Sequence, residues 1–381
     1  MRVLHVIPAL AVHHGGPSFA AADMVQALRN AGVHGEIICT EGRAERHYDN
    51  LWPEGYPTWV HVVPAGPLAS YAYSEALRRW LRERVSSYEL VHIHGLFRYS
   101  TFEAARQCKR TGIPYVVTPH GSLDEWGLRR KRIAKAIYLA GVEFPMLREA
   151  AALHCTSQAE ARSRAVRRLK RPVHVVPIGV SLRPSLHPGS PAGETILFLS
   201  RLDPKKRLEM LFQGLALNVA RHPDLRCVVA GSGEPAYESR LRRLAARLGL
   251  EDRITFAGFV TGHGKQALID GADVFVLPSR DESFGVAVAE AMAAGMPVIV
   301  TRGVALSEEI ERNHAGLVTQ DSPMALAEAI HSLLMDTERA RRLGRNARRL
   351  MIEQFAWHKV TSKLVQMYQE ALGMRRGQPT S

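Results

Sequence analysis

Two glutamates stand at a spacing that suits a ligand with hydroxyl groups at both ends. Glu282 and Glu290 are eight positions apart in "PSRDESFGVAVAEAMAAGMPVIVT" (278–301), on either side of a Phe-Gly step. Carboxylates accept hydrogen bonds from hydroxyls, so one glutamate could hold a ribose and the other a second sugar. A glutamate taken singly is more often a solvated surface residue.

The neighbouring sequence predicts where the two carboxylates lie. An apolar, β-branched run precedes Glu282, and a helical pattern that ends at Gly295 follows it. Glu282 is therefore expected in the loop at the carboxyl end of a strand, and Glu290 about two turns into a helix. Unpaired N–H groups at the helix start, where Gly285 permits close approach, would bind a diphosphate between the carboxylates. Because apolar residues flank Glu290, its carboxylate needs a partner.

A pair of cations follows another predicted strand. The segment "LSRLDPKKRLEMLFQGL" (199–215) places Arg201 at the end of a strand and Lys206 just before a helix. A guanidinium fork and an ammonium at one turn suit a diphosphate. The alternative, a solvated basic helix start, would oppose the helix dipole. Lys205 is adjacent, and Lys206 is the lysine that we favour.

A glycine pair and a histidine in the first half of the chain are candidate site residues, because each lies at or just after the end of a predicted strand. Gly15 and Gly16 follow the first predicted strand and open the first helix. His120 ends a predicted strand in "YVVTPHGSL", and His94 in "LVHIHG" is a parallel, weaker case. A histidine at such a place is more often a satisfied cleft or core residue than a catalyst.

Strand and helix patterns alternate along the chain, which predicts parallel sheets with helices on both faces. The predicted strands are 2–9, 35–40, 61–65, 90–95, 115–121, 152–157, 173–179, 195–200, 226–233, 253–260, 274–279, 297–301 and 316–319. The predicted helices are 17–31, 72–86, 100–111, 130–149, 157–169, 204–221, 236–248, 263–271, 284–294, 322–335, 337–354 and 358–376. A Pro- and Gly-rich segment, 180–194, predicts a linker between two doubly wound domains. Ligands of such sheets bind at the carboxyl ends of the strands, where the candidate residues fall.

The stretch "EAMAAGMPVIV", with its two glutamates, resembles the signature of the retaining glycosyltransferases of family 4, which have a Glu-x7-Glu motif and the GT-B fold. The resemblance implies two Rossmann-like α/β domains that face each other across a cleft. Residues 1–180 would form the acceptor side and 190–356 would bind the nucleotide sugar, while a C-terminal helix, about 357–381, would cross back to the first domain. It also implies transfer of a hexose from a nucleotide diphosphate sugar to an acceptor hydroxyl, with retention.

The resemblance assigns roles to individual residues. The donor-binding residues of the second domain would be Arg201, Lys206, Val260, Glu282, Ser283, Phe284, Gly285 and Glu290. Glu282 would contact the donor sugar, Glu290 the ribose, and the backbone of Phe284 and Gly285 the sugar and diphosphate. In the family pattern a glycine follows the lysine that corresponds to Lys206. In this chain that position is Arg207.

The first domain would supply Gly15 and Gly16 near the donor phosphates and His120 beside the reacting sugar. The catalytic set is then His120, Arg201, Lys206 and Glu282. No DxD triplet follows a predicted strand, and the cations and the helix end would stabilise the diphosphate, so neither a metal nor another cofactor is expected. We expect a UDP-sugar as donor; the alternative is a GDP-mannose-dependent mannosyltransferase.

The net charge of +13 and the isoelectric point of about 9.9 indicate an anionic partner. The run "RRKRIAK" (129–135) begins a segment, 129–148, that could meet anionic lipid or a lipid pyrophosphate, or could equally be a solvated helix face. The string "TPHGSLDEW" resembles enzymes of bacterial exopolysaccharide assembly, which implies a glycan or lipid-linked acceptor.

The compartment is expected to be reducing. The four cysteines are scattered without a CxxC pair, which is typical of buried thiols: Cys39, Cys108, Cys155 and Cys227. The apolar start is interrupted by His5 and Pro8 and predicts a strand, not a signal peptide. No stretch reaches the length of a membrane span. We expect a cytoplasmic protein, with peripheral contact at the inner face of the membrane as an option.

Three rival functions remain open. A nucleotide-sugar epimerase of the same fold would need carboxylates placed for proton abstraction, and no such pair stands out. A nucleic-acid binder would fit the basic charge, but the chain lacks aromatic residues interleaved with basic strands and lacks a recognition helix, so nucleic acid is not an expected partner. An inactive sugar-binding protein would be expected to lose one of the two glutamates.

Overall fold

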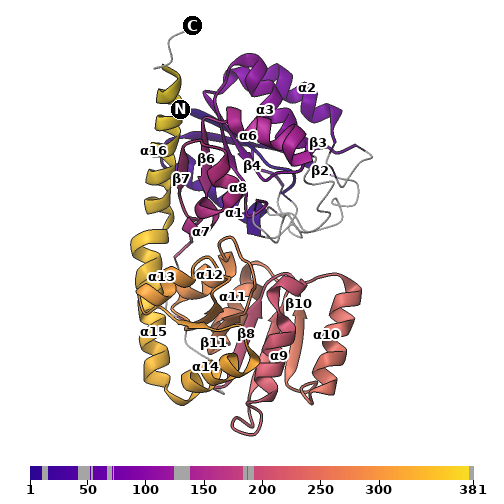
Figure 1. The fold of residues 1–381 in the computed structure, drawn as a ribbon, viewed down its shortest axis with the longest axis vertical. Helices are drawn as coiled ribbons and strands as arrows, with labels where there is room; N and C mark the ends of the chain where they lie inside the picture. The colour runs from indigo at the N-terminus through magenta and orange to yellow at the C-terminus, as the bar shows by residue number, and fades with distance from the viewer. Residues whose placement is uncertain are drawn as a thin grey trace. The chain divides into compact units, whose positions relative to one another are not determined.

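The structure, a computed structural model, describes residues 1–10, 16–41, 52, 55–66, 71, 73–123, 138–182, 187 and 193–376. Gly15 and residues 129–137 of the basic segment 129–148 lie outside these residues. The chain divides into two compact units (Figure 1). The first unit is Met1–Gly179 together with the segment that begins at Trp357, and the second is Val180–Ala356.

The first unit is built on a parallel sheet, with seven strands among its described residues in the order β3-β2-β1-β4-β5-β6-β7. The strand order reverses between β1 and β4. The strands are β1 (Arg2–Val6), β2 (His34–Glu41), β3 (Val60–Pro64), β4 (Leu90–His94), β5 (Tyr115–Thr118), β6 (Ala152–Cys155) and β7 (Val173–Val175). The helices are α1 (Gly16–Asn30), α2 (Glu75–Arg84), α3 (Tyr99–Thr111), α6 (Phe144–Glu149), α7 (Gln158–Arg162), α8 (Arg164–Arg168) and α16 (Trp357–Arg376).

Two expected helices of the first unit differ in the structure. The helix expected over 157–169 is divided into α7 and α8 at Ser163, whose side chain accepts a hydrogen bond from the N–H of Val166 and so caps the second helix. In the described part of 130–149, a π-helical turn, Leu139–Glu143, precedes α6.

The last helix, α16, is part of the core of the first unit. Its apolar face is buried in one cluster with residues of β1, β4, β5 and β6, and that face comprises Val360, Leu364, Met367, Tyr368 and Ala371. Gly179 lies directly against Trp357, because a Cβ on Gly179 would stand 2.3 Å from atoms of the indole ring. The sequence from Trp357 onward therefore folds with the first unit.

The second unit has six strands among its described residues, in the order β10-β9-β8-β11-β12-β13, with the reversal between β8 and β11. The strands are β8 (Thr195–Leu199), β9 (Arg226–Ala230), β10 (Ile254–Gly258), β11 (Val274–Leu277), β12 (Val298–Thr301) and β13 (Leu317–Thr319). The helices are α9 (Leu208–Ala216), α10 (Pro235–Arg247), α11 (Gly262–Asp270), α12 (Val286–Ala294), α13 (Ser307–Arg312), α14 (Pro323–Met335) and α15 (Thr337–Leu350).

Two features of the second unit depart from the expected helices. The helix expected over 204–221 is a 3₁₀ turn, Pro204–Lys206, followed by α9, because Arg207 adopts a left-handed φ of 56° between them. The helix α13 was not expected from its sequence, and its six residues are too few to show a helical period.

Burial agrees with one further expectation. All four cysteines are buried, as their spacing indicated. Among the described residues, none of the helices combines the length and the apolar character that a membrane span requires.

Candidate functional site

The second unit brings Arg201, Lys206 and Glu282 to one edge of its sheet. Arg201 and Lys206 follow β8, and Glu282 follows β11. The two strands are hydrogen-bonded neighbours at the point where the strand order reverses. Open α/β sheets bind their ligands at the carboxyl ends of the strands beside such a point. The three residues thus lie at the edge of the sheet where open α/β folds bind their ligands.

Lys206 and Glu282 form an ion pair although they are 76 positions apart. The Lys206 side chain is 5% exposed and its Nζ contacts Oε2 of Glu282, whose side chain is 18% exposed. Burial lowers the pKa of Lys206 to about 7, and the positive charges of Lys205 and Arg201 act in the same direction. A buried ammonium in this setting needs an anion beside it, and without ligand that anion is Glu282.

The backbone of Glu282 is held by the loop that follows β12. Its N–H donates to the carbonyl of Gly303 at 2.9 Å, and its carbonyl accepts from the N–H of Ala305 at 2.9 Å. A Cβ on Gly303 would stand 2.2 Å from the carbonyl oxygen of Arg280, so only glycine permits this approach. Gly303 is a positioning residue that the sequence reasoning missed, and its signal is only a glycine after a strand.

The helix α12 begins close to where the sequence predicted a helix start. Gly285 is the N-cap residue and has a left-handed φ of 96°, and α12 begins at Val286. The first N–H groups of a helix have no intrahelical acceptor and carry the positive end of its dipole. The Phe284 side chain is buried, with its ring centroid 6.0 Å from that of Phe355. Phe284 thereby anchors the loop that carries Glu282 and Ser283.

Glu290 has the partner that its apolar neighbours required. Its Oε1 accepts a hydrogen bond from Nζ of Lys265, in α11, at 2.5 Å. The Glu290 side chain is 30% exposed, which is less enclosed than its sequence surroundings suggested. Sequence reasoning missed Lys265 because it lies on another helix, 25 positions away.

Glycines after β9 position the loop of Arg201. A Cβ on Gly231 would stand 1.9 Å from the carbonyl oxygen of Ser200, and one on Gly233 would stand 2.2 Å from that of Leu202. The segment "AGSG" was an available signal for this close approach. Val260 follows β10, the outer strand, so the structure places it on the same edge but two strands from β8.

His120 and Gly16 belong to the first unit. Gly16 is the first residue of α1, after β1, while Gly15 is not among the described residues. His120 follows β5 with a left-handed φ of 52°, and its Nε2 lies 3.1 Å from Nδ1 of His94. Burial lowers the pKa of His120 to about 3, so the imidazole is neutral at physiological pH.

A buried carboxylate holds the loop beyond His120. Oε1 of Glu160 accepts a hydrogen bond from the N–H of Gly121 at 2.7 Å. Its Oε2 accepts from the N–H of Thr156 at 2.8 Å. Glu160 therefore ties the loops after β5 and β6 together, and its place in a short helix gave no sign of this in the sequence.

Comparisons with known proteins bear on both units. Residues 189–350 match the family model described as glycosyl transferases group 1. Residues 15–179 match the model described as a glycosyl transferase 4-like domain.

Two relatives illustrate the matches. A D-inositol 3-phosphate glycosyltransferase of Stackebrandtia nassauensis is 27% identical over 398 residues, which covers 96% of this chain and 89% of the relative. A GDP-mannose-dependent alpha-(1-6)-phosphatidylinositol monomannoside mannosyltransferase of Mycobacterium tuberculosis is 34% identical over 178 residues, 45% of this chain and 46% of the relative. Three relatives that are 33% identical are likewise matched over only 40–45% of their own lengths.

A solved structure establishes the fold. Anabaena HepE, in complex with UDP and glucose, superposes with a TM-score of 0.76 at 20% identity, covering 97% of this chain and 99% of that one. Together with the two parallel sheets, this likeness shows that the chain has the GT-B fold expected from its sequence.

Proposed function

Because the chain is built from two glycosyltransferase-family domains on a GT-B fold, we propose that it is a retaining hexosyltransferase that uses a nucleotide diphosphate sugar. The donor is a UDP-sugar, and the acceptor is a glycan or a lipid-linked glycan of bacterial exopolysaccharide assembly. Val180–Ala356 holds the nucleotide sugar, and the first unit holds the acceptor.

The observation that carries this proposal is the ion pair of Lys206 with Glu282 beside Arg201 at the switch point of the second sheet. Arg201, Lys206 and the start of α12 would stabilise the negative charge that develops on the leaving diphosphate. As the ammonium of Lys206 turns to a phosphate oxygen, the Glu282 carboxylate is released to accept a hydrogen bond from a hydroxyl of the donor sugar.

Glu290 would accept hydrogen bonds from the ribose hydroxyls, in place of or together with Lys265. His120, which is neutral, would hydrogen-bond to the reacting sugar. The positive charge supplied by these residues makes a metal dispensable for leaving-group stabilisation, so activity is expected to persist in EDTA.

Two donors have separate support. UDP is favoured because the solved structural neighbour binds UDP and glucose, and GDP-mannose is the alternative because the mycobacterial relative uses it. Membrane contact through 129–148 stays a prediction that rests on charge alone.

The decisive experiment records thermal unfolding with UDP, GDP and ADP for the wild type and for Glu290→Ala. A nucleotide at a hundred times its dissociation constant stabilises the protein by about 2.7 kcal/mol. We expect the UDP shift to be lost in Glu290→Ala and kept in the surface control Glu338→Ala, whose side chain is 74% exposed. If no nucleotide raises the midpoint, the proposal fails. Conversion of a nucleotide sugar to its sugar epimer without any acceptor would indicate an epimerase instead.

A further inference from the structure

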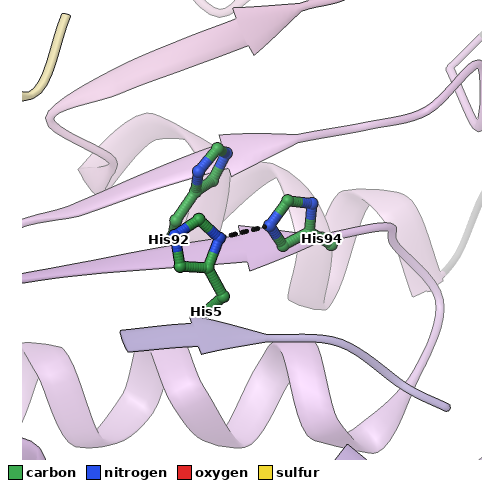
Figure 2. Close-up of side chains that lie close together, drawn as sticks. All are labelled: His5, His92 and His94. Atoms are coloured by element: carbon green, nitrogen blue, oxygen red, sulfur yellow. Dashed lines mark hydrogen bonds between the residues drawn. The ribbon is translucent and has the colours of Figure 1, made fainter. Parts of the chain in front are cut away.

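A row of buried histidines crosses the sheet of the first unit. His5 lies on β1, His92 and His94 on β4, and His154 on β6, and all four are fully buried. Figure 2 shows His5, His92 and His94 close together, with the hydrogen bond that joins His5 to His94. Histidines rarely gather in a parallel sheet, which is normally filled by aliphatic side chains.

In one set of these hydrogen bonds the direction of each donation can be assigned, because the set ends at a backbone carbonyl that can only accept. Nε2 of His154 lies 2.7 Å from the carbonyl oxygen of Val176, so it must donate, and Nδ1 of His154 must accept from the Thr118 hydroxyl at 2.8 Å. That hydroxyl, having donated its proton, accepts from Nε2 of His92 at 2.7 Å. Nδ1 of His92 then accepts from the hydroxyl of Tyr368 at 2.7 Å. Every member of this network is neutral and satisfied.

The second set leads to His120. Nδ1 of His5 lies 3.0 Å from Nε2 of His94, and Nδ1 of His94 lies 3.1 Å from Nε2 of His120. Nε2 of His5 is buried and has no hydrogen-bond partner among the described residues. If the protons pointed toward His5, that nitrogen would carry an orphan N–H; if they point toward His120, it carries only a bare lone pair. Orphan buried N–H groups are rarer than under-satisfied acceptors, which favours donation toward His120.

We propose that His5 and His94 are positioning residues that hold His120 in the tautomer protonated on Nδ1. In this arrangement Nε2 of His120 accepts from His94, and its Nδ1–H is presented as a hydrogen-bond donor to the oxygen of a sugar hydroxyl. The choice of ligand rests on the proposed function, whereas the tautomer follows from the hydrogen bonds alone.

Two observations support a single, neutral tautomer. Burial lowers the pKa of His5 and of His120 to about 3 and that of His94 well below its ordinary value, so none of the three is charged at physiological pH. Glu160 fixes the backbone beyond His120 through the N–H of Gly121, which restricts where the imidazole can lie.

A metal at the same place is the competing use of these residues. Nitrogens of His5, His92 and His94 lie within 4.8 Å of one another, close enough to share one ion. Both nitrogens of His92 and both nitrogens of His94 are already hydrogen-bonded. A metal would therefore break bonds that the network satisfies, and we assign the cluster to positioning.

The test is a two-bond ¹H–¹⁵N correlation spectrum of the full chain with ¹⁵N-labelled histidine at pH 7. The His120 signals are identified by their loss in His120→Gln. We expect a protonated Nδ1 and an unprotonated Nε2 in the wild type. In His94→Gln, which loses the group facing His120, we expect a mixture of tautomers. Tyr368→Phe removes a buried hydrogen bond of the other network and should leave the His120 pattern unchanged.

Activity provides a second readout. His94→Gln should lower kcat about tenfold, the loss of one hydrogen bond, while changing the donor KM less than about twofold. His94→Asn, whose amide lies near the position of Nδ1, should restore part of kcat. If the chain binds no nucleotide, the proposed function fails but the spectrum still decides the tautomer.

Three results would overturn the inference. The first is a wild-type His120 protonated on Nε2, and the second is a His120 pattern that His94→Gln leaves unchanged. The third is stoichiometric binding of added Zn²⁺ that shifts the signals of His5, His92 and His94 together, since it would assign the cluster to a metal.

Discussion

Lys206 is the residue around which the site of the second unit is arranged. It is a buried ammonium whose local partner is a carboxylate that the proposed reaction also needs. A ligand phosphate can take over the role of Glu282 and free that carboxylate for the sugar. Glu290 is likewise paired with a lysine, Lys265 of α11. Each of the two predicted carboxylates is therefore paired with a lysine in the structure.

Replacing Lys206 by alanine should weaken UDP binding about 10- to 100-fold, since charge-assisted hydrogen bonds contribute about 1.5–3 kcal/mol. Lys205→Ala is the matched control, because the same charge is removed at the adjacent position, and it should weaken binding less than about threefold. Isothermal titration of both variants measures the difference. Equal losses would show that the two lysines act only through overall charge.

The lowered pKa of Lys206 predicts a pH dependence of binding. A bound diphosphate raises that pKa above 7, so binding takes up protons at higher pH and affinity for UDP should fall by up to tenfold per pH unit between about pH 7.5 and 9. Titrations in buffers of different ionisation enthalpy would report the proton uptake. Lys206→Met should abolish both effects, and a flat wild-type profile would contradict the assignment.

The stability of the ligand-free protein should change in the opposite direction. Between pH 7 and 10.5 the unfolded chain binds more protons at Lys206 than the folded one, so this residue makes stability rise with pH in that window. Denaturant unfolding of the wild type and of Lys206→Met across this range would isolate the contribution, and identical slopes for the two proteins would argue against a lowered pKa.

At the scale of elements, the site depends on loops that lie in direct backbone contact. The loop after β11 is hydrogen-bonded to the loop after β12, and the loop after β9 is hydrogen-bonded to the loop after β8. Glycines occur where a side chain would collide with a neighbouring carbonyl, as at Gly231 and Gly303. The loops therefore position one another through these backbone contacts. The strands determine only the point at which each loop begins.

Gly303→Ala should displace the backbone of Arg280 and with it the loop of Glu282, because a Cβ would lie 2.2 Å from the Arg280 carbonyl oxygen. We expect a loss of about 2 kcal/mol or more in stability and a UDP affinity reduced at least tenfold. Gly373→Ala is the control, since nothing lies within 4 Å of its Cβ position in α16. It should stabilise the protein slightly, by about 0.5–1 kcal/mol. Unchanged nucleotide binding in Gly303→Ala would show that the loops are independent.

At the scale of the whole molecule, the core of the first unit includes the last helix, α16. The second unit is inserted between Gly179 and Trp357, so the first core contains residues from both ends of the chain. Tyr368 of α16 also donates to His92, which joins the helix to the histidine network. The folding of the first unit thus depends on sequence that follows the second.

Leu364→Ala should destabilise the first unit by about 2–5 kcal/mol, the usual cost of such a cavity. Hydrogen exchange followed by mass spectrometry should show lost protection in β1, β4 and β5 and none in β8 or β11. Leu326→Ala provides the reciprocal control, because Leu326 is equally buried in α14 of the second unit. Loss of protection spread evenly over both units would mean that they unfold as one.

The alternation of strand and helix patterns predicted most of the fold, and short motifs predicted most of the candidate site residues. The apolar runs predicted the strands of both sheets to within a few residues, because a parallel strand buried on both faces is continuous in sequence. Glu282, Lys206 and Arg201 could be chosen because each follows such a strand, where a parallel sheet binds its ligands. The division of 157–169, the turn at Arg207 and the short helix α13 depended on caps and single backbone angles that leave no periodic pattern.

The sequence by itself determined the succession of strands and helices along the chain and the residues that follow each strand, since both are read from local periodicity. Only the tertiary structure decided which of those residues meet. The pairing of Lys206 with Glu282, of Lys265 with Glu290, and of His5 with His94 and His120 spans 25 to 89 positions. The physical reason is that strand order and helix packing, not neighbourhood along the chain, set these distances, and the partner of a buried charge or imidazole is known only when the sheet has formed.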